Sequence, residues 1–226
     1  MEPGTRELLL DYAGLLADYD KANVIGTRDP DEILVGHILD SLSCMLFAPL
    51  RAASRIADIG SGGGMPGIPL AAVLPDAKVT LFESVGKKAA FLRYASEVLS
   101  LGNVRIVNSR IEEAARERAH RGAYNVCTAR ALARLPVVSE YALPLLRGGG
   151  YVIAMKARRD VDELAEGERA AALLGGRLSH EITVAQTIGV QQKERRLVVI
   201  EKVEETPNRY PRKTGTPAKA PLGTEK

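Results

Sequence analysis

The chain has 226 residues, of which 46% are hydrophobic, and a formal net charge of +3, which together predict one globular domain with short appendages. No apolar run approaches the roughly 18 to 20 residues of a membrane span, and the first residues are acidic rather than basic, so we expect a cytoplasmic protein without a membrane anchor. The only two cysteines, Cys44 and Cys127, lie far apart without C-x-x-C spacing, which argues against a disulfide framework or a metal site and favours two small core residues.

Two helices are predicted in the first 50 residues. A helical pattern runs over residues 5–19, and a second helix follows a loop. The sequence Asp29-Pro30-Asp31-Glu32 offers this second helix an N-cap, a first-turn proline and a capping-box acid, and apolar residues then follow at helical spacing. We therefore expect residues 1–50 to form a helical extension packed on the main sheet.

From residue 55 onward, short apolar strands alternate with helical stretches, which indicates a parallel sheet with helices on its faces. The predicted strands span residues 55–59, 78–83, 104–108, 124–128 and 151–156, with a further pair at 178–186 and 196–203. No convincing helix separates that last pair, so the sheet should end in an antiparallel, hairpin-like pair. An α/β fold with a doubly wound, mostly parallel sheet is expected over residues 51–204.

After Val203 the composition changes abruptly to a basic, Pro-rich tail, residues 205–226. It holds four of the chain's twelve prolines, and residues 206–226 carry five Lys or Arg against one Glu, whereas residues 1–50 carry three against nine acidic residues. Such a tail is expected to be extended or disordered until something binds it. The asymmetry suggests a polyanionic partner, although on charge alone a solvated surface is the simpler explanation.

A glycine-rich segment follows the first core strand, with the sequence Ala-Asp-Ile-Gly-Ser-Gly-Gly-Gly-Met-Pro-Gly-Ile-Pro-Leu from Ala57 to Leu70. Glycines let the backbone turn sharply and let a ligand approach main-chain N–H groups at the start of the next helix. The G-x-G-x-x-G match from Gly62 to Gly67 is weak by itself, since an ordinary strand-to-helix turn would look the same. The loop nevertheless predicts a ligand at the carboxyl end of this strand.

Glu83 ends the second predicted strand, at the spacing of roughly 20 residues where an acidic side chain accepts hydrogen bonds from ribose hydroxyls. Sites for NAD and for S-adenosylmethionine share this arrangement. Pro66 and Pro69 stand at the helix start, where a dinucleotide site offers consecutive N–H donors to a pyrophosphate, so S-adenosylmethionine is favoured. For Glu83 taken alone, a solvated strand end is the alternative.

Further candidates follow the next three strands. Ile111 would flank an adenine ring while its main chain and that of Glu112 contact the ring edge, although two acidic residues also suit an ordinary helix start. Arg130 would bind the cofactor's carboxylate or an RNA phosphate as a planar fork, with an exposed helix-start arginine as the alternative. Lys156, at the end of the fifth strand, raises the same question.

Together these segments resemble the 16S rRNA guanine-N7 methyltransferase family, historically called glucose-inhibited division protein B. The resemblance spans about residues 23–221 and rests on the Asp58–Leu70 loop, Glu83–Leu92, Ala129-Arg130-Ala131, Met155-Lys156 and Thr206–Arg212. It implies a class I methyltransferase (Rossmann-like) fold with a seven-stranded sheet and S-adenosylmethionine at its carboxyl edge. Carried onto this sequence, the cofactor contacts fall on Gly60, Met65, Glu83, Ser84, Val85, Ile111, Glu112 and Arg130.

The sequence departs from the family's pattern at two positions. Met65 stands where another bulky apolar residue is usual, which changes little because Met fills the same gap. Gly36 stands where an arginine is expected before His37, which weakens the case for an RNA contact from this helix. His37 is either a partly buried structural histidine or a substrate-side group.

The tail carries the remaining candidates for RNA contact. Arg209, Arg212 and Lys213 are interleaved with Tyr210 and prolines, a pattern that suits phosphate contacts or base stacking. A free basic tail without a defined role is the alternative. The resemblance implies the 16S rRNA of the small ribosomal subunit as partner, and we expect a monomer without a metal.

The resemblance implies transfer of a methyl group from S-adenosylmethionine to N7 of a guanine. Guanine N7 has a free lone pair and no proton to lose, so direct in-line transfer without a general base is expected, with rate coming from positioning and from polar groups matched to the moving charge. Two alternatives stay open at this point, namely an NAD-type oxidoreductase and a catalytically inactive RNA-binding module.

Overall fold

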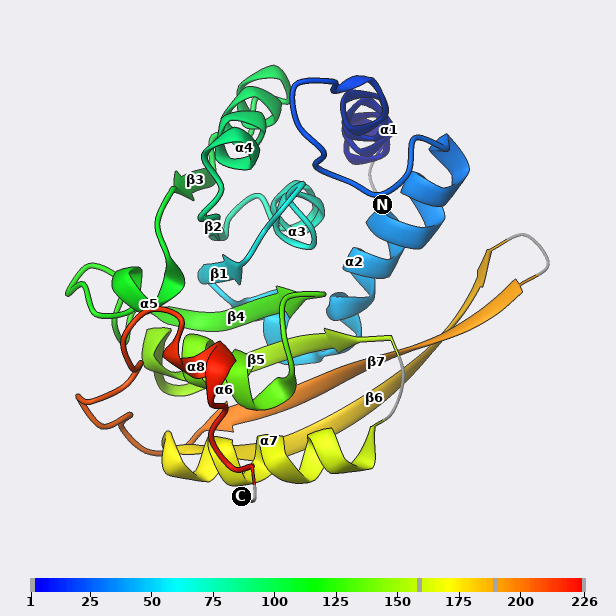
Figure 1. Ribbon diagram of the computed structural model, residues 1–226. Helices are drawn as coiled ribbons and strands as arrows, with labels where there is room; N and C mark the ends of the chain where they lie inside the picture. The colour runs from blue at the N-terminus through cyan, green and yellow to red at the C-terminus, as the bar shows by residue number, and fades with distance from the viewer. Residues whose placement is uncertain (1–2, 158–159, 189–190, 225–226) are drawn as a thin grey trace.

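A single mixed sheet organises the protein, whose computed structural model describes residues 3–157, 160–188 and 191–224. The seven strands within these residues follow the order β3-β2-β1-β4-β5-β7-β6 (Figure 1). Their bounds are β1 Arg55–Ile59, β2 Lys78–Phe82, β3 Val104–Val107, β4 Tyr124–Arg130, β5 Leu146–Lys156, β6 Gly176–Ile188 and β7 Gln191–Lys202. Strands β1 to β5 pair in parallel, whereas β7 is antiparallel to both β5 and β6. The predicted α/β class and the antiparallel end pair are confirmed.

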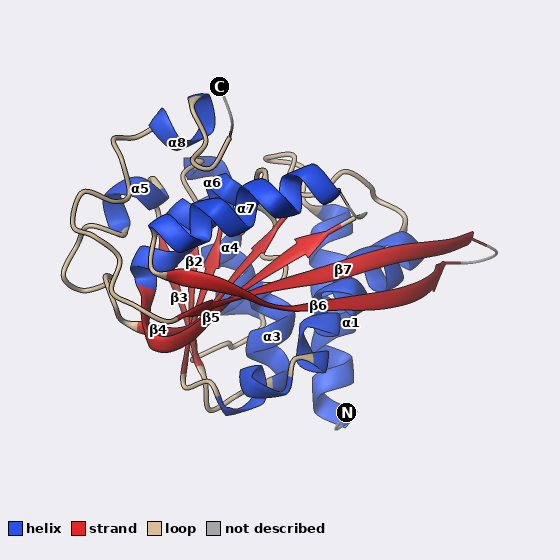
Figure 2. Cartoon of the chain, turned by 90° about the horizontal axis from the view of Figure 1, so that it is seen from below, coloured by secondary structure: helices blue, strands red, loops and turns tan. Residues whose placement is uncertain are grey.

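Helices cover both faces of this sheet (Figures 1 and 2). One face carries α1 Pro3–Asp18, the π-helix η1 Glu32–Leu39, α2 Asp40–Leu42, α3 Gly67–Val73 and α4 Gly86–Val98. The other carries α5 Ile111–Ala114, α6 Leu135–Ala142, α7 Val161–Leu173 and α8 Thr216–Lys219. Short 3-10 turns complete the chain as η2 Ser43–Leu46, η3 Ala48–Ala52 and η4 Leu143–Leu145.

The sheet separates two apolar cores because successive strand residues point to opposite faces. In β1, Ile56 belongs to the core under α1, α3 and α4, while Ala57 belongs to the core under α6 and α7. In β4, Val126 and Cys127 divide in the same way. Cys44 and Cys127 are both buried and unpaired, so their prediction as core residues is confirmed.

The helices α1, η1 and α2 precede the first strand, and the second predicted helix differs locally from the predicted one. Asp29 Oδ1 accepts hydrogen bonds from the backbone N–H groups of Asp31 (2.9 Å) and Glu32 (3.0 Å), which confirms the predicted N-cap. The Asp29 N–H donates to Thr27 Oγ1 (3.2 Å) instead of to Glu32, so the predicted capping-box acid does not take that role. The helix that follows is wound as a π-helix over residues 32–39 rather than as an ordinary α-helix. Such wide turns are rare and leave the carbonyl groups of the helix differently directed, which matters for the site described below.

The expectation of an extended or disordered tail is wrong for residues 205–224. Thr206, Tyr210 and Pro211 are buried, and the chain crosses α5 and α6 before forming α8 (Figure 1). Arg121 secures its course by donating hydrogen bonds to the carbonyl oxygens of Thr206 (2.8 Å) and Tyr210 (2.8 Å). Composition does not predict this packing, because the tail is held through its carbonyl groups and the ion pair of Arg212 with Glu140 instead of through an apolar stripe.

The ends of the parallel strands define where a ligand can lie. Strands β2 and β3 stop one residue short of the predicted bounds, so Glu83 and Asn108 are the first residues beyond them. Strand β4 continues to Arg130, which is therefore a strand residue rather than the start of a helix. No helix in the described part of the chain has the length and apolar character needed to cross a membrane.

Candidate active site

The glycine-rich loop turns sharply at the carboxyl end of β1. Gly62 and Gly64 have φ angles of +57° and +96°, a region that other residues adopt only with strain. A Cβ atom at Gly64 would also lie 2.7 Å from the hydroxyl oxygen of Tyr12 on α1. The predicted sharp turn is present, and its glycines also let α1 approach the loop closely.

Glu83 lies against this loop with its carboxylate held by the backbone. Its Oε2 accepts from the N–H of Gly62 (2.9 Å) and its Oε1 from the N–H of Val85 (2.7 Å), and the residue is 6% exposed. Among the described residues, no Lys or Arg forms an ion pair with this carboxylate. Two of its about four acceptor positions are therefore used, and the others suit the hydroxyl groups of a ribose.

The residues predicted to contact the nucleoside lie beside Glu83 at the same sheet edge. Ser84 and Val85 are exposed beside Glu83, and Asn108 Nδ2 ties the end of β2 to that of β3 by donating to the Glu83 carbonyl (2.7 Å). Ile111 and Glu112 are buried at the start of α5. The Glu112 carboxylate is directed into the protein, which leaves its main chain for the predicted contact with an adenine.

Two buried residues tie the loop to its surroundings. Met65, 9% exposed, accepts a hydrogen bond at Sδ from Ser41 Oγ (3.3 Å), so it joins the loop to α2. Asp58 accepts hydrogen bonds from Thr128 Oγ1 (2.9 Å) and from the N–H of Gly67 (3.2 Å), and burial raises its pKa to about 7. No sequence motif predicts this role of Asp58, and its position two residues before Gly60 is the available signal.

Arg130 binds the N-terminal extension with its whole guanidinium group. Its Nη1 donates to the His37 carbonyl (3.1 Å), and its Nη2 donates to the Gly36 carbonyl (3.1 Å) and lies 2.7 Å from His37 Nδ1. Its Nε pairs with Asp40 Oδ2 at 3.2 Å. The two predicted residues Arg130 and His37 are thus brought together, and the carbonyl groups that Arg130 binds belong to the π-helix.

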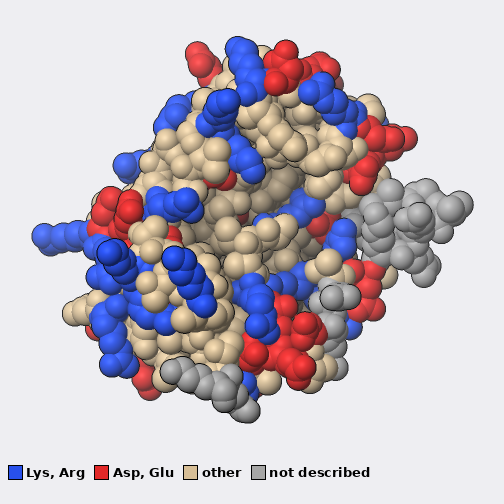
Figure 3. Space-filling view, in the orientation of Figure 1, with Lys and Arg blue, Asp and Glu red and all other residues tan. Residues whose placement is uncertain are grey.

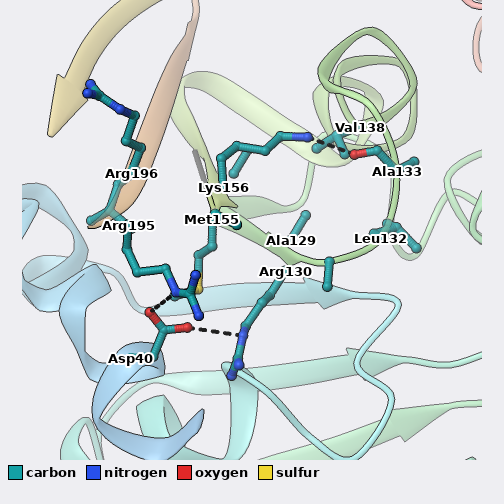
Figure 4. Close-up of a pocket in the computed structure, with 14 residues that line it drawn as sticks. Asp40, Ala129, Arg130, Leu132, Ala133, Val138, Met155, Lys156, Arg195 and Arg196 are labelled. Carbon is teal, nitrogen blue, oxygen red and sulfur yellow. Dashed lines mark hydrogen bonds and ion pairs between the residues drawn. The ribbon is translucent and has the colours of Figure 1, made fainter. Parts of the chain in front are cut away.

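A cavity of about 220 Å³ opens beside Arg130, between the ends of β4, β5 and the β6–β7 hairpin (Figure 4). Asp40, 3% exposed, lies between Arg130 and Arg195, whose Nε is 3.5 Å from Asp40 Oδ1. Burial raises the pKa of Asp40, while the two arginines oppose that rise. Lys156 Nζ also lines the cavity, where it donates to the Ala133 carbonyl (2.8 Å) and pairs with Glu163 Oε1 (2.5 Å).

Sequence reasoning missed three charged residues of this cavity, Asp40, Arg195 and Arg196. The two arginines stand in a charged run that is typical of an exposed hairpin, and only the pairing of β7 with β5 places Arg196 opposite Lys156. Asp40 lay on the predicted helix with no motif around it. Its role depends on the crossing of two segments about 90 residues apart, which local sequence patterns do not reveal.

The three tail cations behave differently from one another. Arg212 donates from Nε and Nη2 to both carboxylate oxygens of Glu140, so its fork fixes the tail. Arg209 and Lys213 are exposed, and the Arg209 guanidinium lies 5.1 Å from the centre of the Tyr210 ring. Lys and Arg side chains gather on the side of the molecule that carries α5 and the tail, beside a central hollow (Figure 3).

Comparisons with known proteins point to one family. The family described as rRNA small subunit methyltransferase G matches residues 5–198. Ribosomal RNA small subunit methyltransferase G of Rubrobacter xylanophilus is 59% identical over 216 residues, covering 95% of this chain and 83% of that protein. The protein of the same name in Chloroflexus aggregans is 44% identical over 204 residues, covering 90% and 84%. The O-methyltransferase TomG of Streptomyces achromogenes, solved in complex with SAM, has a TM-score of 0.55 at 18% identity and covers 88% of this chain and 90% of its own, which shows a class I methyltransferase fold.

Proposed function

Because this chain belongs to the rRNA small subunit methyltransferase G family, we propose that it transfers a methyl group from S-adenosylmethionine to N7 of a guanine in 16S ribosomal RNA. The observation that carries this proposal is the placement, at one sheet edge, of the Glu83 carboxylate against the glycine loop and of a cavity lined by cations. Family membership overturns the alternative of an NAD-type oxidoreductase, and the experiment below tests the alternative of an inactive RNA-binding module.

The proposed cofactor contacts follow the edge from β1 to β4. They are Gly60, Met65, Glu83, Ser84, Val85, Ile111, Glu112 and Arg130. Glu83 accepts hydrogen bonds from the ribose hydroxyls, and Ile111 flanks the adenine. Arg130 acts on the methionine carboxylate through its positive charge rather than as a fork, because Gly36, His37 and Asp40 occupy its guanidinium. When bound, S-adenosylmethionine supplies an electrophilic methyl group on a sulfonium.

The residues around the cavity orient the guanine and respond to its change in charge. N7 uses its own lone pair, so no side chain has to remove a proton. Methylation leaves the base positively charged, and the Asp40 carboxylate, which pairs with Arg130 and Arg195, is the acidic group that offsets this charge. His37 and Lys156 are the further candidates on the substrate side.

The surface beyond the cavity suits a large polyanion. Arg209 and Lys213 are exposed in the tail, and Arg116 and Arg118 are exposed after α5, so these four cations are proposed to contact RNA phosphates. Arg212 leaves this set because Glu140 occupies its guanidinium. We propose a monomer that acts in the cytoplasm on the small ribosomal subunit, whose RNA fold supplies much of the target specificity.

The decisive assay is methyl transfer from labelled S-adenosylmethionine to small subunits that lack prior modification, compared with naked 16S rRNA. Nuclease digestion and mass spectrometry then identify the product, which is expected to be 7-methylguanosine. Glu83→Ala should lose cofactor binding and transfer together, whereas Glu168→Gln, an exposed change on α7, should retain both. No transfer by a protein that binds the cofactor tightly would overturn the ribosomal assignment.

A further inference from the structure

The segment of residues 205–222, called here the C-terminal strap, begins at a buried polar anchor. Lys202, 5% exposed, donates from Nζ to the Leu143 carbonyl (2.7 Å) and to Thr206 Oγ1. Thr206 Oγ1 donates in turn to the Leu174 carbonyl (2.7 Å). Arg116 then donates from Nη2 to the Pro211 carbonyl, so the chain is directed along α5. The strap therefore has a defined path from its first residues.

The middle of the strap neutralises a carboxylate that the core buries completely. Glu140 on α6 is 0% exposed, and among the described residues all of its hydrogen-bond donors belong to Arg212. Those donors are the backbone N–H (2.7 Å), Nε (2.9 Å) and Nη2 (2.6 Å). An unpaired carboxylate in this position would be costly, so α6 and the strap depend on one another.

Beyond Arg212 the strap reaches the residue next to the proposed adenine position. Gly215 donates its backbone N–H to Glu112 Oε1 (2.9 Å), and Tyr141 on α6 donates its hydroxyl to the same oxygen (3.2 Å). Thr214 Oγ1 bonds to the adjacent Glu113 (3.3 Å). Glu112 is 4% exposed, so its side chain is clamped between the strap and α6 while its main chain stays at the sheet edge.

We propose that the C-terminal strap positions the main chain of Ile111 and Glu112 for recognition of the cofactor's adenine. Arg212, Glu140 and Gly215 are then positioning residues, since they act through the Glu112 carboxylate rather than on the ligand. This inference rests on the proposed function, and it gives the strap a role in cofactor selectivity. Main-chain donors and acceptors distinguish adenine from other bases only while they are held at hydrogen-bond distance. Greater mobility of this segment therefore lowers the selectivity for adenine.

A strap that positions the main chain affects the selectivity between two ligands, whereas a strap that only stabilises the fold does not. S-adenosylhomocysteine carries adenine, whereas S-inosylhomocysteine has a carbonyl in place of the 6-amino group and an N1–H donor in place of the N1 acceptor, and is otherwise the same molecule. Arg212→Ala should weaken binding of the adenine ligand by about tenfold, the loss of one good hydrogen bond, and leave binding of the inosine ligand nearly unchanged. Isothermal titration calorimetry at a temperature well below the unfolding transition measures both dissociation constants.

Two conservative variants and one control variant in the strap complete this test. Glu140→Gln retains acceptor oxygen but loses the ion pair, so it should shift selectivity in the same direction by less, and Arg212→Lys should recover part of the loss. Lys219→Ala, an exposed change on α8, should bind both ligands as the unaltered protein does. Equal weakening of both ligands, or a lowered melting temperature with selectivity intact, would show the strap to be structural only.

These measurements do not involve RNA, so they stand apart from the ribosomal assignment. If the unaltered protein prefers S-adenosylhomocysteine and strap variants lose that preference, the inference holds even where the target nucleotide differs from the one proposed. If the unaltered protein binds neither ligand, the proposed function fails and the inference fails with it.

Discussion

The two ends of the chain dock on the methyltransferase core in opposite ways. The N-terminal extension buries large apolar side chains, with Tyr12, Leu16 and Ile38 between 0% and 1% exposed. The C-terminal strap buries chiefly Tyr210 and is otherwise held by the ion pair of Arg212 with Glu140 and by hydrogen bonds to its carbonyl groups. An apolar stripe is visible in a sequence, whereas polar docking is not.

The ion pairs of the two ends are also reversed in sign, with the acidic partner in the N-terminal extension and the basic partner in the strap. The N-terminal extension offers acceptors, the Gly36 carbonyl and the Asp40 carboxylate, to the core cation Arg130. The strap offers donors to the core carboxylates of Glu140 and Glu112. Part of the charge asymmetry between the two ends therefore serves contacts within the molecule, and the remainder is free for a partner.

The largest expected effect comes from removing apolar burial under the N-terminal extension. Leu16→Ala should lower the free energy of unfolding by about 2 to 5 kcal/mol, because it deletes a fully buried side chain and leaves a cavity. Leu10→Ala on the same helix, where the leucine is 43% exposed, should change it little. Urea denaturation of both variants provides the comparison, and equal effects would contradict the apolar docking of α1.

A smaller loss is expected at the strap. Arg212→Ala should cost about 2 kcal/mol, less than for a fully enclosed pair, because the Arg212 side chain is 25% exposed while Glu140 is not. Hydrogen exchange should show increased opening of residues 205–222 before the sheet opens. Protection of the strap equal to that in Lys219→Ala would mean that the ion pair does not hold it.

The stability that Asp40 gives to the N-terminal extension should depend on pH. Burial raises the folded-state pKa of Asp40 above its ordinary 3.8. The stabilisation linked to this proton is complete at pH below 3.8 and is lost as the pH rises through the folded value. The stability advantage of the unaltered protein over Asp40→Asn should therefore shrink with increasing pH, as measured by denaturation at several pH values. An advantage that grows with pH would contradict the direction of the shift.

The smallest effects belong to the exposed cations of the strap. Lys213→Ala and Arg209→Ala should each weaken RNA binding modestly and reduce the slope of log K against log salt by about 1, without altering cofactor affinity. Lys78→Ala, exposed at the start of β2 on the opposite edge of the sheet, should leave the slope unchanged. Filter binding over a range of salt concentrations tests both, and an unaltered slope would remove the strap from the RNA interface.

Features that depend on residues close in sequence could be predicted, whereas contacts between distant segments could not. Strand periodicity and glycine punctuation are local signals, so the sheet, its antiparallel end and the turn beside Glu83 could be predicted. The contacts of Arg130 with Asp40 and of Arg212 with Glu140 join segments 90 and 72 residues apart. Such pairs become visible only once the sheet order is known, because each member alone looks like a solvated charge.

The π-helix shows a different limit of sequence reasoning. Its capping signal at Asp29 was local and correctly predicted, whereas its winding was not. Residues 32–39 have no composition that distinguishes them from an ordinary helix. The carbonyl groups of Gly36 and His37 are satisfied by Arg130 from β4, a tertiary contact that stabilises the irregular turn.

The two buried cysteines allow the opening of each face of the sheet to be timed separately. Cys44 lies in the core beneath the N-terminal extension and Cys127 in the core beneath α6, on opposite faces of the sheet. Burial raises the pKa of both thiols, so neither reacts with a thiol dye while its core is closed. The labelling rate of each thiol in native buffer thus reports how often one face opens. A strap variant should raise the labelling rate of Cys127 and leave that of Cys44 unchanged.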